Sequence, residues 1–177
     1  MSEGPRILLF TGDGKGKTTA ALGMALRAVG HGLRVFIVQF IKNDPRTGEK
    51  RALQLLPHVE FHQVGLGFVP TGADDRQALA PHQKAAEDGL KRVGERLRNG
   101  ACDLVILDEI CTACALGLVS ETEVLELLSN SPPGLTWVLT GRDAPESFAA
   151  MADTVTVMVC QKHGFDTKMR AKRGVEF

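Results

Sequence analysis

The residues of this chain that could do chemistry begin with a glycine-rich segment. Residues 11–19 read Thr-Gly-Asp-Gly-Lys-Gly-Lys-Thr-Thr, between a short apolar run and a helix-like one. In a phosphate loop, glycines let backbone N–H groups turn toward an anion, the helix start adds a positive dipole end, the lysine supplies charge and the threonine hydroxyl reaches Mg²⁺. The sequence therefore predicts nucleotide binding by Gly12, Asp13, Gly14, Lys15, Gly16, Lys17, Thr18 and Thr19.

The glycine spacing of this segment departs from the usual phosphate-loop pattern. Gly16, Lys17 and Thr18 match the last three positions of that pattern. The pattern opens on a glycine, whereas this chain has Thr11 at that position. Asp13 is a second departure, because a carboxylate that faces a polyphosphate is repelled unless it points away or toward a metal. A glycine-rich turn without a nucleotide is the alternative, and the strand and helix predicted on either side argue against it.

A pair of carboxylates forms the second group. Asp108 and Glu109 directly follow the apolar run 104–107, as the acidic strand end that accompanies a phosphate loop does. In such a site one carboxylate holds Mg²⁺ or its waters, and the other can orient a nucleophile. The sequence therefore predicts a Mg²⁺ site formed by Thr18, Asp108 and Glu109. The alternative is that the two acids merely cap a helix.

Arg142 is the third candidate, because it follows the apolar run 137–139. Its planar guanidinium can neutralise a phosphate with a fork of donors. The alternative is a structural salt bridge to Asp108 or Asp143. No Ser/His/Asp or Cys/His arrangement stands out in the sequence, so we expect the attacking nucleophile to come with the substrate.

The spacing of Cys111 and Cys114 raises the question of a zinc or redox site. Zinc needs two further ligands at compatible spacing, and Cys102 and Cys160 belong to other predicted elements. The first residues lack a signal-peptide core, which favours the cytoplasm, where thiols stay reduced. We therefore predict that the cysteines serve as small buried side chains. Metal or redox chemistry is the alternative.

The elements that must position these residues alternate between strands and helices. Apolar runs predict strands at 7–10, 35–38, 59–64, 104–109, 137–139 and 155–159. Helical spacing and capping residues predict helices at 20–29, 53–56, 81–99 with Pro81 in the first turn, 120–128 with a capping box, and 145–151. This order predicts one α/β domain over residues 1–177, with a doubly wound, mainly parallel sheet and helices on both faces, of the RecA-like P-loop NTPase class.

Sheets of this kind bind ligands at the carboxyl ends of their strands. Polar or glycine-rich groups follow the predicted strands at 12–19, Gln39, 65–68, 108–109, 140–142 and 161–163. His163 is the one histidine expected at this edge. The loop that begins at Gly65 is unusual, because it is apolar where a loop should be polar. One edge of the sheet is therefore predicted to carry the function.

Composition narrows the classes of partner. Of 177 residues, 44% are hydrophobic and 24% are charged, and 21 Lys+Arg balance 21 Asp+Glu. The chain is long enough for one core, and its zero net charge gives no overall field that attracts nucleic acid or an anionic membrane. No segment has the apolar length of a membrane span. We therefore expect a cytoplasmic domain without a nucleic-acid or membrane partner.

Several short runs along the chain share one resemblance. They are Gly-Asp-Gly-Lys-Gly-Lys-Thr-Thr (12–19), Arg-Ala-Val-Gly-His-Gly (27–32), Val-Gln-Phe-Ile-Lys (38–42), Leu-Asp-Glu (107–109), Leu-Thr-Gly-Arg (139–142), Ala-Asp-Thr-Val (152–155) and Lys-His-Gly-Phe-Asp (162–166). In this order, from residue 6 to Phe177, the chain closely resembles the ATP:corrinoid adenosyltransferases of the phosphate-loop type. The shifted glycine spacing is that family's own pattern.

The resemblance implies adenosyl transfer. The cobalt of cob(I)alamin or a related corrinoid attacks the ribose 5′ carbon of ATP, and inorganic triphosphate leaves. Co(I) is itself a potent nucleophile, so no protein base is required. Lys17, Thr18 and Glu109 would be the catalytic residues, which with Mg²⁺ absorb charge as the carbon–oxygen bond breaks. In the family, ATP lies in the loop in the orientation opposite to that of ordinary phosphate-loop ATPases.

The corrinoid would bind at the apolar loop and at the segment after the last strand. The resemblance assigns this role to Gly67, Phe68, Lys162 and His163. Members of the family have a Phe-x-Trp pair in the loop, whereas this chain has Phe68 and then Pro70 at the Trp position. Longer members also carry an N-terminal helical extension over the active site. We further expect a flavoprotein reductase as electron donor and a homodimer.

Two other classes of function are compatible with a nucleotide site alone. In a small-molecule kinase or ATPase, Glu109 would orient water or an acceptor hydroxyl, and ADP would be a product. A nucleotide-dependent switch or carrier would bind without rapid turnover, although the Asn-Lys-x-Asp guanine motif of GTPases is missing from the sequence. The identity of the products separates these classes.

Overall fold

The computed structural model describes residues 4–70, 76–100, 102–164 and 169–175. Strands and helices alternate along the chain, as the sequence predicts. The strands are β1 (Arg6–Thr11), β2 (Val35–Gln39), β3 (Val59–Gln63), β4 (Leu104–Asp108), β5 (Thr136–Thr140) and β6 (Thr154–Val157). The helices are α1 (Lys17–Gly30), α2 (Gly48–Leu55), α3 (Arg76–Asn99), α4 (Ile110–Ala115), α5 (Glu121–Ser129) and α6 (Glu146–Met151).

The strands form a 6-stranded sheet in the order β3-β2-β4-β5-β1-β6. Every pairing between these strands is parallel. The sheet is therefore fully parallel, whereas the sequence predicted a mainly parallel one. β5 lies between β1 and β4, and this inserted strand separates the strand before the glycine loop from the strand before the carboxylates. The predicted α/β class with a parallel sheet is therefore confirmed, and the structure adds the strand order.

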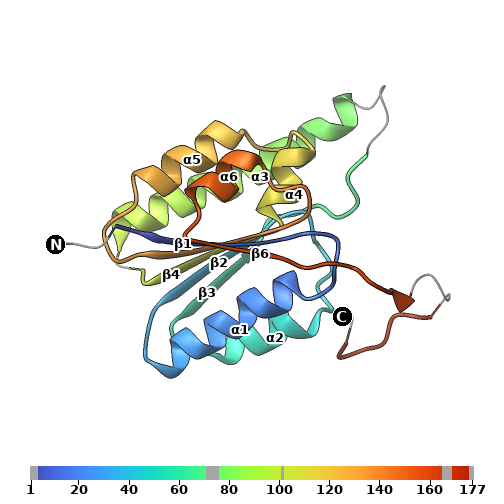
Figure 1. Ribbon diagram of the computed structural model, residues 1–177, viewed down its shortest axis with the longest axis horizontal. Helices are drawn as coiled ribbons and strands as arrows, with labels where there is room; N and C mark the ends of the chain where they lie inside the picture. Colours follow the sequence, from blue (N-terminus) through green and yellow to red (C-terminus); the bar gives the residue numbers. More distant parts are fainter. Residues whose placement is uncertain (1–3, 71–75, 101, 165–168, 176–177) are drawn as a thin grey trace.

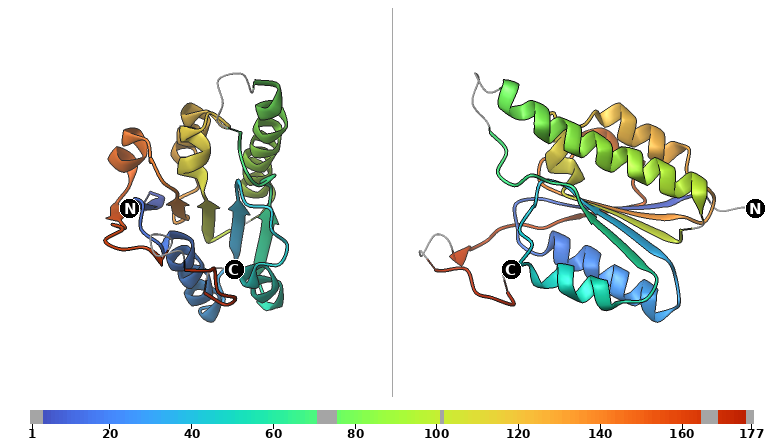
Figure 2. Two further views of the ribbon diagram at one scale, coloured as in Figure 1. Left: turned by 90° about the vertical axis from the view of Figure 1, so that its right-hand side faces the viewer. Right: turned by 180° about the vertical axis from the view of Figure 1, so that it is seen from behind.

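Helices cover both faces of the sheet, with α1 and α2 on one side and α3, α4, α5 and α6 on the other (Figures 1 and 2). Each face has its own core, because successive side chains of a buried strand point to opposite faces. Leu9 and Leu139 pack in the core under α3 to α6, whereas Phe10 and Val138 pack in the core under α1 and α2. The continuous apolar runs of β2, β4 and β5 follow from this double coverage.

The helix that contains Pro81 begins earlier than the sequence predicts. α3 starts at Arg76, so Pro81 lies inside the helix and not in its first turn. Proline has no N–H to donate to the carbonyl of Gln77, which costs the helix one hydrogen bond. Gln77 is exposed, and this end of α3 projects beyond the sheet, so water can satisfy that carbonyl (Figure 1).

Two further helices differ from prediction. α2 spans Gly48–Leu55, whereas only residues 53–56 were predicted as helical, and the short α4 was not predicted at all. The capping box at Ser120 and Glu123 is confirmed at the start of α5. No helix in the described ranges is both long and apolar enough to cross a membrane.

Candidate functional site

The glycine loop between β1 and α1 is shaped by the chain that leaves β6. Gly14 N–H donates to the carbonyl of Met158 at 2.7 Å, and Met158 N–H donates to the carbonyl of Thr11 at 2.8 Å. A Cβ atom on Gly12 or Gly14 would lie 2.5 or 2.7 Å from the Met158 carbonyl oxygen, which is too close for any side chain. The unusual positions of the glycines therefore follow from the passage of residue 158 beside the loop.

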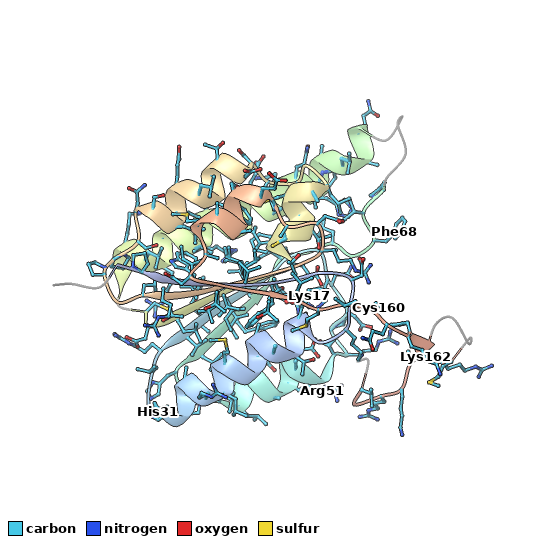
Figure 3. The ribbon with its side chains drawn as sticks, viewed as in Figure 1. Lys17, His31, Arg51, Phe68, Cys160 and Lys162 are labelled. Atoms are coloured by element: carbon cyan, nitrogen blue, oxygen red, sulfur yellow. The ribbon has the colours of Figure 1, made fainter. Side chains whose placement is uncertain are left out.

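Lys17 is held inside this loop by backbone carbonyls. Its ammonium donates to the carbonyl oxygens of Gly12 and Gly14, at 2.5 and 2.9 Å. Burial lowers the pKa of Lys17 below its usual value, and the nearby Glu109 carboxylate partly opposes this shift. The lysine is thus positioned at the start of α1, at the carboxyl end of the sheet (Figure 3).

Asp108 is the buried centre of the site, with only 1% of its surface exposed. Its carboxylate accepts hydrogen bonds from Thr18 Oγ1 at 2.8 Å and from Thr140 Oγ1 at 2.7 Å. Gln39, its register partner on β2, donates to the other carboxylate oxygen at 2.9 Å. Charge-assisted bonds of this kind are strong. Asp108 therefore fixes the position of the Thr18 hydroxyl relative to the sheet.

Glu109 begins the turn into α4 in an uncommon backbone conformation, with φ at 64°. A non-glycine residue in the left-handed region stores strain, which is a frequent feature of functional sites. Its backbone N–H donates to Thr140 Oγ1 at 2.9 Å, and its carboxylate accepts from the Thr112 hydroxyl at 2.8 Å. These contacts hold the carboxylate beside the glycine loop.

Lys42 is a member of this site that sequence reasoning did not assign. Its ammonium is 2.8 Å from Thr18 Oγ1, 3.3 Å from Asp108 Oδ2 and 3.8 Å from Glu109 Oε1. The available signal was its place just after β2, at the edge of the sheet where the other candidates lie. In the sequence, Lys42 stands out only as the last residue of the run 38–42.

The same three residues fit a divalent cation. One cationic group, the Lys42 ammonium, already reaches Thr18, Asp108 and Glu109, so their oxygens converge on one point. A hydroxyl and one or two carboxylates, completed by phosphate oxygens and water, form a donor set that suits Mg²⁺. The described residues contain no cluster of three or more His, Cys, Asp or Glu side chains that would hold a metal without a nucleotide.

Arg142 lies next to Asp13 and not next to the acids considered from the sequence. Its Nε is 3.8 Å from Asp13 Oδ1, so the salt bridges to Asp108 or Asp143 that we considered are wrong. Both side chains are exposed, at 61% for Arg142 and 81% for Asp13. The Asp13 carboxylate therefore points toward Arg142 at the edge of the site. Such an exposed ion pair is weak, so Arg142 can easily exchange Asp13 for a phosphate.

A cavity of about 720 Å³ opens over the glycine loop. Its lining includes loop residues 13–19, Lys42, Glu109, Arg142 and His163. Residues 174–175, near the C-terminus, also line it, which the sequence did not indicate. Most of the predicted nucleotide residues are thus brought together around one space, while Asp108 lies beneath it. Of the predicted corrinoid residues, only His163 contributes to this lining.

The loop that carries Gly67 and Phe68 lies at the same end of the sheet. Gly67 N–H donates to the carbonyl of Ile41 at 2.7 Å, which attaches this loop to the segment that carries Lys42. Phe68 is 88% exposed and points outward, whereas Val69 is buried (Figure 3). The Phe68 side chain therefore does not pack in the hydrophobic core. Lys162 lies in the exposed segment beyond β6, at this end of the molecule.

The cysteines of α4 lie in or against the hydrophobic core. Burial raises the pKa of Cys111 to about 12 and that of Cys114 to about 12, so both thiols stay protonated near neutral pH. A protonated thiol is neither a good nucleophile nor a metal ligand. Cys111 is fully buried, while Cys160 is exposed in the segment that follows β6.

Comparison with known proteins gives consistent matches over nearly the whole chain. A family model described as ATP:corrinoid adenosyltransferase BtuR/CobO/CobP matches residues 3–177. A corrinoid adenosyltransferase of Escherichia coli is 37% identical over 172 residues, which cover 97% of this chain and 85% of that protein. The corrinoid adenosyltransferase CobA of Salmonella typhimurium shows the same identity and coverage. A corrinoid adenosyltransferase of Pseudomonas aeruginosa is also 37% identical, over 97% of this chain and 83% of that protein.

Proposed function

The chain belongs to the BtuR/CobO/CobP family of ATP:corrinoid adenosyltransferases, and from this premise we propose the reaction that its site performs. The enzyme transfers the 5′-deoxyadenosyl group of Mg-ATP to the cobalt of a reduced corrinoid, cob(I)alamin or cob(I)yrinic acid a,c-diamide. A cobalt–carbon bond forms with the electron pair of Co(I), the C5′–oxygen bond breaks, and inorganic triphosphate leaves with that bond's electrons. The product serves adenosylcobalamin biosynthesis or salvage.

The observation that carries this proposal is the joint position of the glycine loop and the exposed Phe68 loop. The cavity over residues 13–19 is lined by cationic side chains from different elements, Lys15, Lys17, Lys42 and Arg142. Such a set suits a whole triphosphate as leaving group, because its several negative charges need several cationic partners. The Phe68 loop, attached through Ile41, offers an apolar surface beside that cavity.

The glycine loop and the residues around Thr18 have distinct roles in this reaction. The backbone of residues 12–19 binds the triphosphate, and Lys17 exchanges its two backbone carbonyls for phosphate oxygens. Thr18, Asp108 and Glu109 would hold Mg²⁺, which neutralises charge on the departing triphosphate when it is bound. Asp108 acts mainly by orienting Thr18. Stabilisation that grows as the bond breaks lowers the barrier of the chemical step, whereas equal stabilisation of the ground state does not.

We assign Phe68 to the corrinoid. Co(II) that keeps a lower axial ligand is hard to reduce, so the enzyme gains from an apolar side chain that fills that space. Phe68 is exposed and has no core to fill, which supports this role. Gly67, Lys162 and His163 belong to the same proposed surface. A flavoprotein reductase as electron donor and a homodimer complete the proposal.

Product analysis tests the proposed function. The protein is incubated with Mg-ATP and chemically reduced cob(I)alamin, and the products are separated by anion-exchange chromatography. We expect inorganic triphosphate and adenosylcobalamin in equal amounts. ADP with phosphate, formed at the same rate with or without the corrinoid, would indicate a kinase or ATPase and refute the proposal. Controls omit the corrinoid or replace Mg²⁺ with a chelator.

A further inference from the structure

Lys42 supplies a positive charge at the place where the site is most negative. The Asp108 side chain is 1% exposed and the Glu109 side chain is 20% exposed, so solvent screens the two carboxylates only in part. A buried negative cluster is costly unless a cation compensates it. The Lys42 ammonium, 3.3 Å from Asp108 and 3.8 Å from Glu109, provides that compensation.

The ammonium and a metal ion would compete for the same oxygen atoms. Thr18 Oγ1 donates its proton to Asp108 Oδ1 and accepts a hydrogen bond from Lys42 at 2.8 Å. Mg²⁺ binds oxygen ligands at about 2.1 Å, so at the hydroxyl of Thr18 it would lie close to the Lys42 ammonium that the same oxygen accepts. Two cations held by one set of oxygens also repel each other. Lys42 must therefore leave this position when the metal binds.

Only the side chain of Lys42 needs to move. The backbone around it is fastened, because Phe40 N–H donates to the Asp108 carbonyl at 2.9 Å and Gly67 N–H donates to the Ile41 carbonyl at 2.7 Å. The Lys42 side chain, by contrast, is 34% exposed and lines the cavity over the glycine loop. Rotation about its side-chain bonds takes the ammonium from the carboxylates into the space that a triphosphate would fill.

We propose that Lys42 is the internal counter-cation of the metal site. It neutralises the site in the nucleotide-free enzyme, yields the oxygens to the metal when Mg-ATP arrives, and then contacts the triphosphate. This inference rests on the proposed function, which supplies the metal and the nucleotide. Its consequence is that the metal binds tightly only together with the nucleotide, because the displaced ammonium needs phosphate as a new partner.

Metal binding without nucleotide tests this role directly. Mn²⁺ is titrated into the protein and followed by electron paramagnetic resonance, with wild type compared to Lys42→Met and Lys42→Gln. Both variants remove the charge, and the glutamine keeps a donor for Thr18. Two controls are Lys42→Arg, which keeps the charge, and Lys84→Met, which removes a charge on α3 where the side chain is 77% exposed.

We expect the two neutral variants to bind Mn²⁺ at least about tenfold more tightly than wild type without nucleotide, because no ammonium opposes the metal. Lys42→Arg and Lys84→Met should behave as wild type, and thermal melting checks that every variant is folded. With ATP present, wild type should gain more in Mn²⁺ affinity than the neutral variants do.

Two outcomes would overturn the inference, and they are distinguishable. If all variants bind Mn²⁺ with ATP, but wild type and both neutral variants bind it equally without ATP, Lys42 is no counter-cation and the metal site stands. If wild type binds no Mn²⁺ even with ATP, the proposed metal site itself is wrong, and the role of Lys42 is refuted with it.

Discussion

Replacement of Thr140 by valine should remove the link between the Asp108 carboxylate and the backbone of Glu109. Thr140 is completely buried, and its hydroxyl donates to Asp108 Oδ1 at 2.7 Å and accepts from Glu109 N–H at 2.9 Å. Valine has nearly the same shape but can make neither hydrogen bond. The variant therefore tests hydrogen bonding with little change in packing.

The expected fall in the free energy of unfolding is the sum of two contributions. A hydrogen bond to a charged group contributes roughly 1.5–3 kcal/mol, and a buried N–H without a partner costs roughly 1–3 kcal/mol. Water can reach the partly buried Glu109 N–H and offsets some of the second term. We therefore expect the free energy of unfolding to fall by about 3 kcal/mol. In a chain of this size, that corresponds to a fall of roughly 6–12 °C in Tm.

Urea denaturation and thermal melting of Thr140→Val measure this loss. The matched control is Thr136→Val, the same change at the first residue of β5, at the opposite end of the strand from Asp108. We expect the control to change stability by less than about 1 kcal/mol. If Thr140→Val costs no more than Thr136→Val, the hydrogen bonds of Thr140 to the Asp108 carboxylate and the Glu109 N–H add no net stability and the reasoning is wrong.

The remaining predictions concern the nucleotide and corrinoid sites. Lys17→Ala and Thr18→Ala should each lower kcat for triphosphate release by roughly 10²-fold or more, because each removes stabilisation of the departing charge; near-normal turnover at saturating Mg-ATP would contradict the assignment of the loop. Asp13→Asn should tighten ATP binding by about two- to fivefold in isothermal titration, because it removes a carboxylate beside the cavity and releases Arg142; unchanged or weaker binding would mean that the pair has no such effect. Phe68→Ala should lose about tenfold more activity when a flavoprotein supplies the electron than when the corrinoid is reduced chemically; equal losses in the two assays would show that Phe68 does not assist reduction.

The sequence by itself determined the strands and most of the helices, the class of fold and the edge that carries the site. Uninterrupted apolar runs such as 104–107 have a buried parallel strand as their natural structure, and Gly16-Lys17-Thr18 between a strand and a helix marks a phosphate loop. The carboxyl ends of parallel strands meet at one edge, so Lys17, Asp108 and Arg142 were expected to lie near one another. The structure brings Lys17 and Arg142 to one cavity, with Asp108 beneath it.

Only the tertiary structure decided what each of these residues contacts. The glycine spacing is explained by Met158, whose carbonyl oxygen lies 2.7 Å from the backbone nitrogen of Gly14 although the two residues are far apart in the chain. Lys42 joined the site, and Arg142 paired with Asp13, because side-chain contacts depend on strand order and on the course of loops. Local propensity and periodicity describe neighbours along the chain, whereas these contacts join segments that only the assembled sheet brings together.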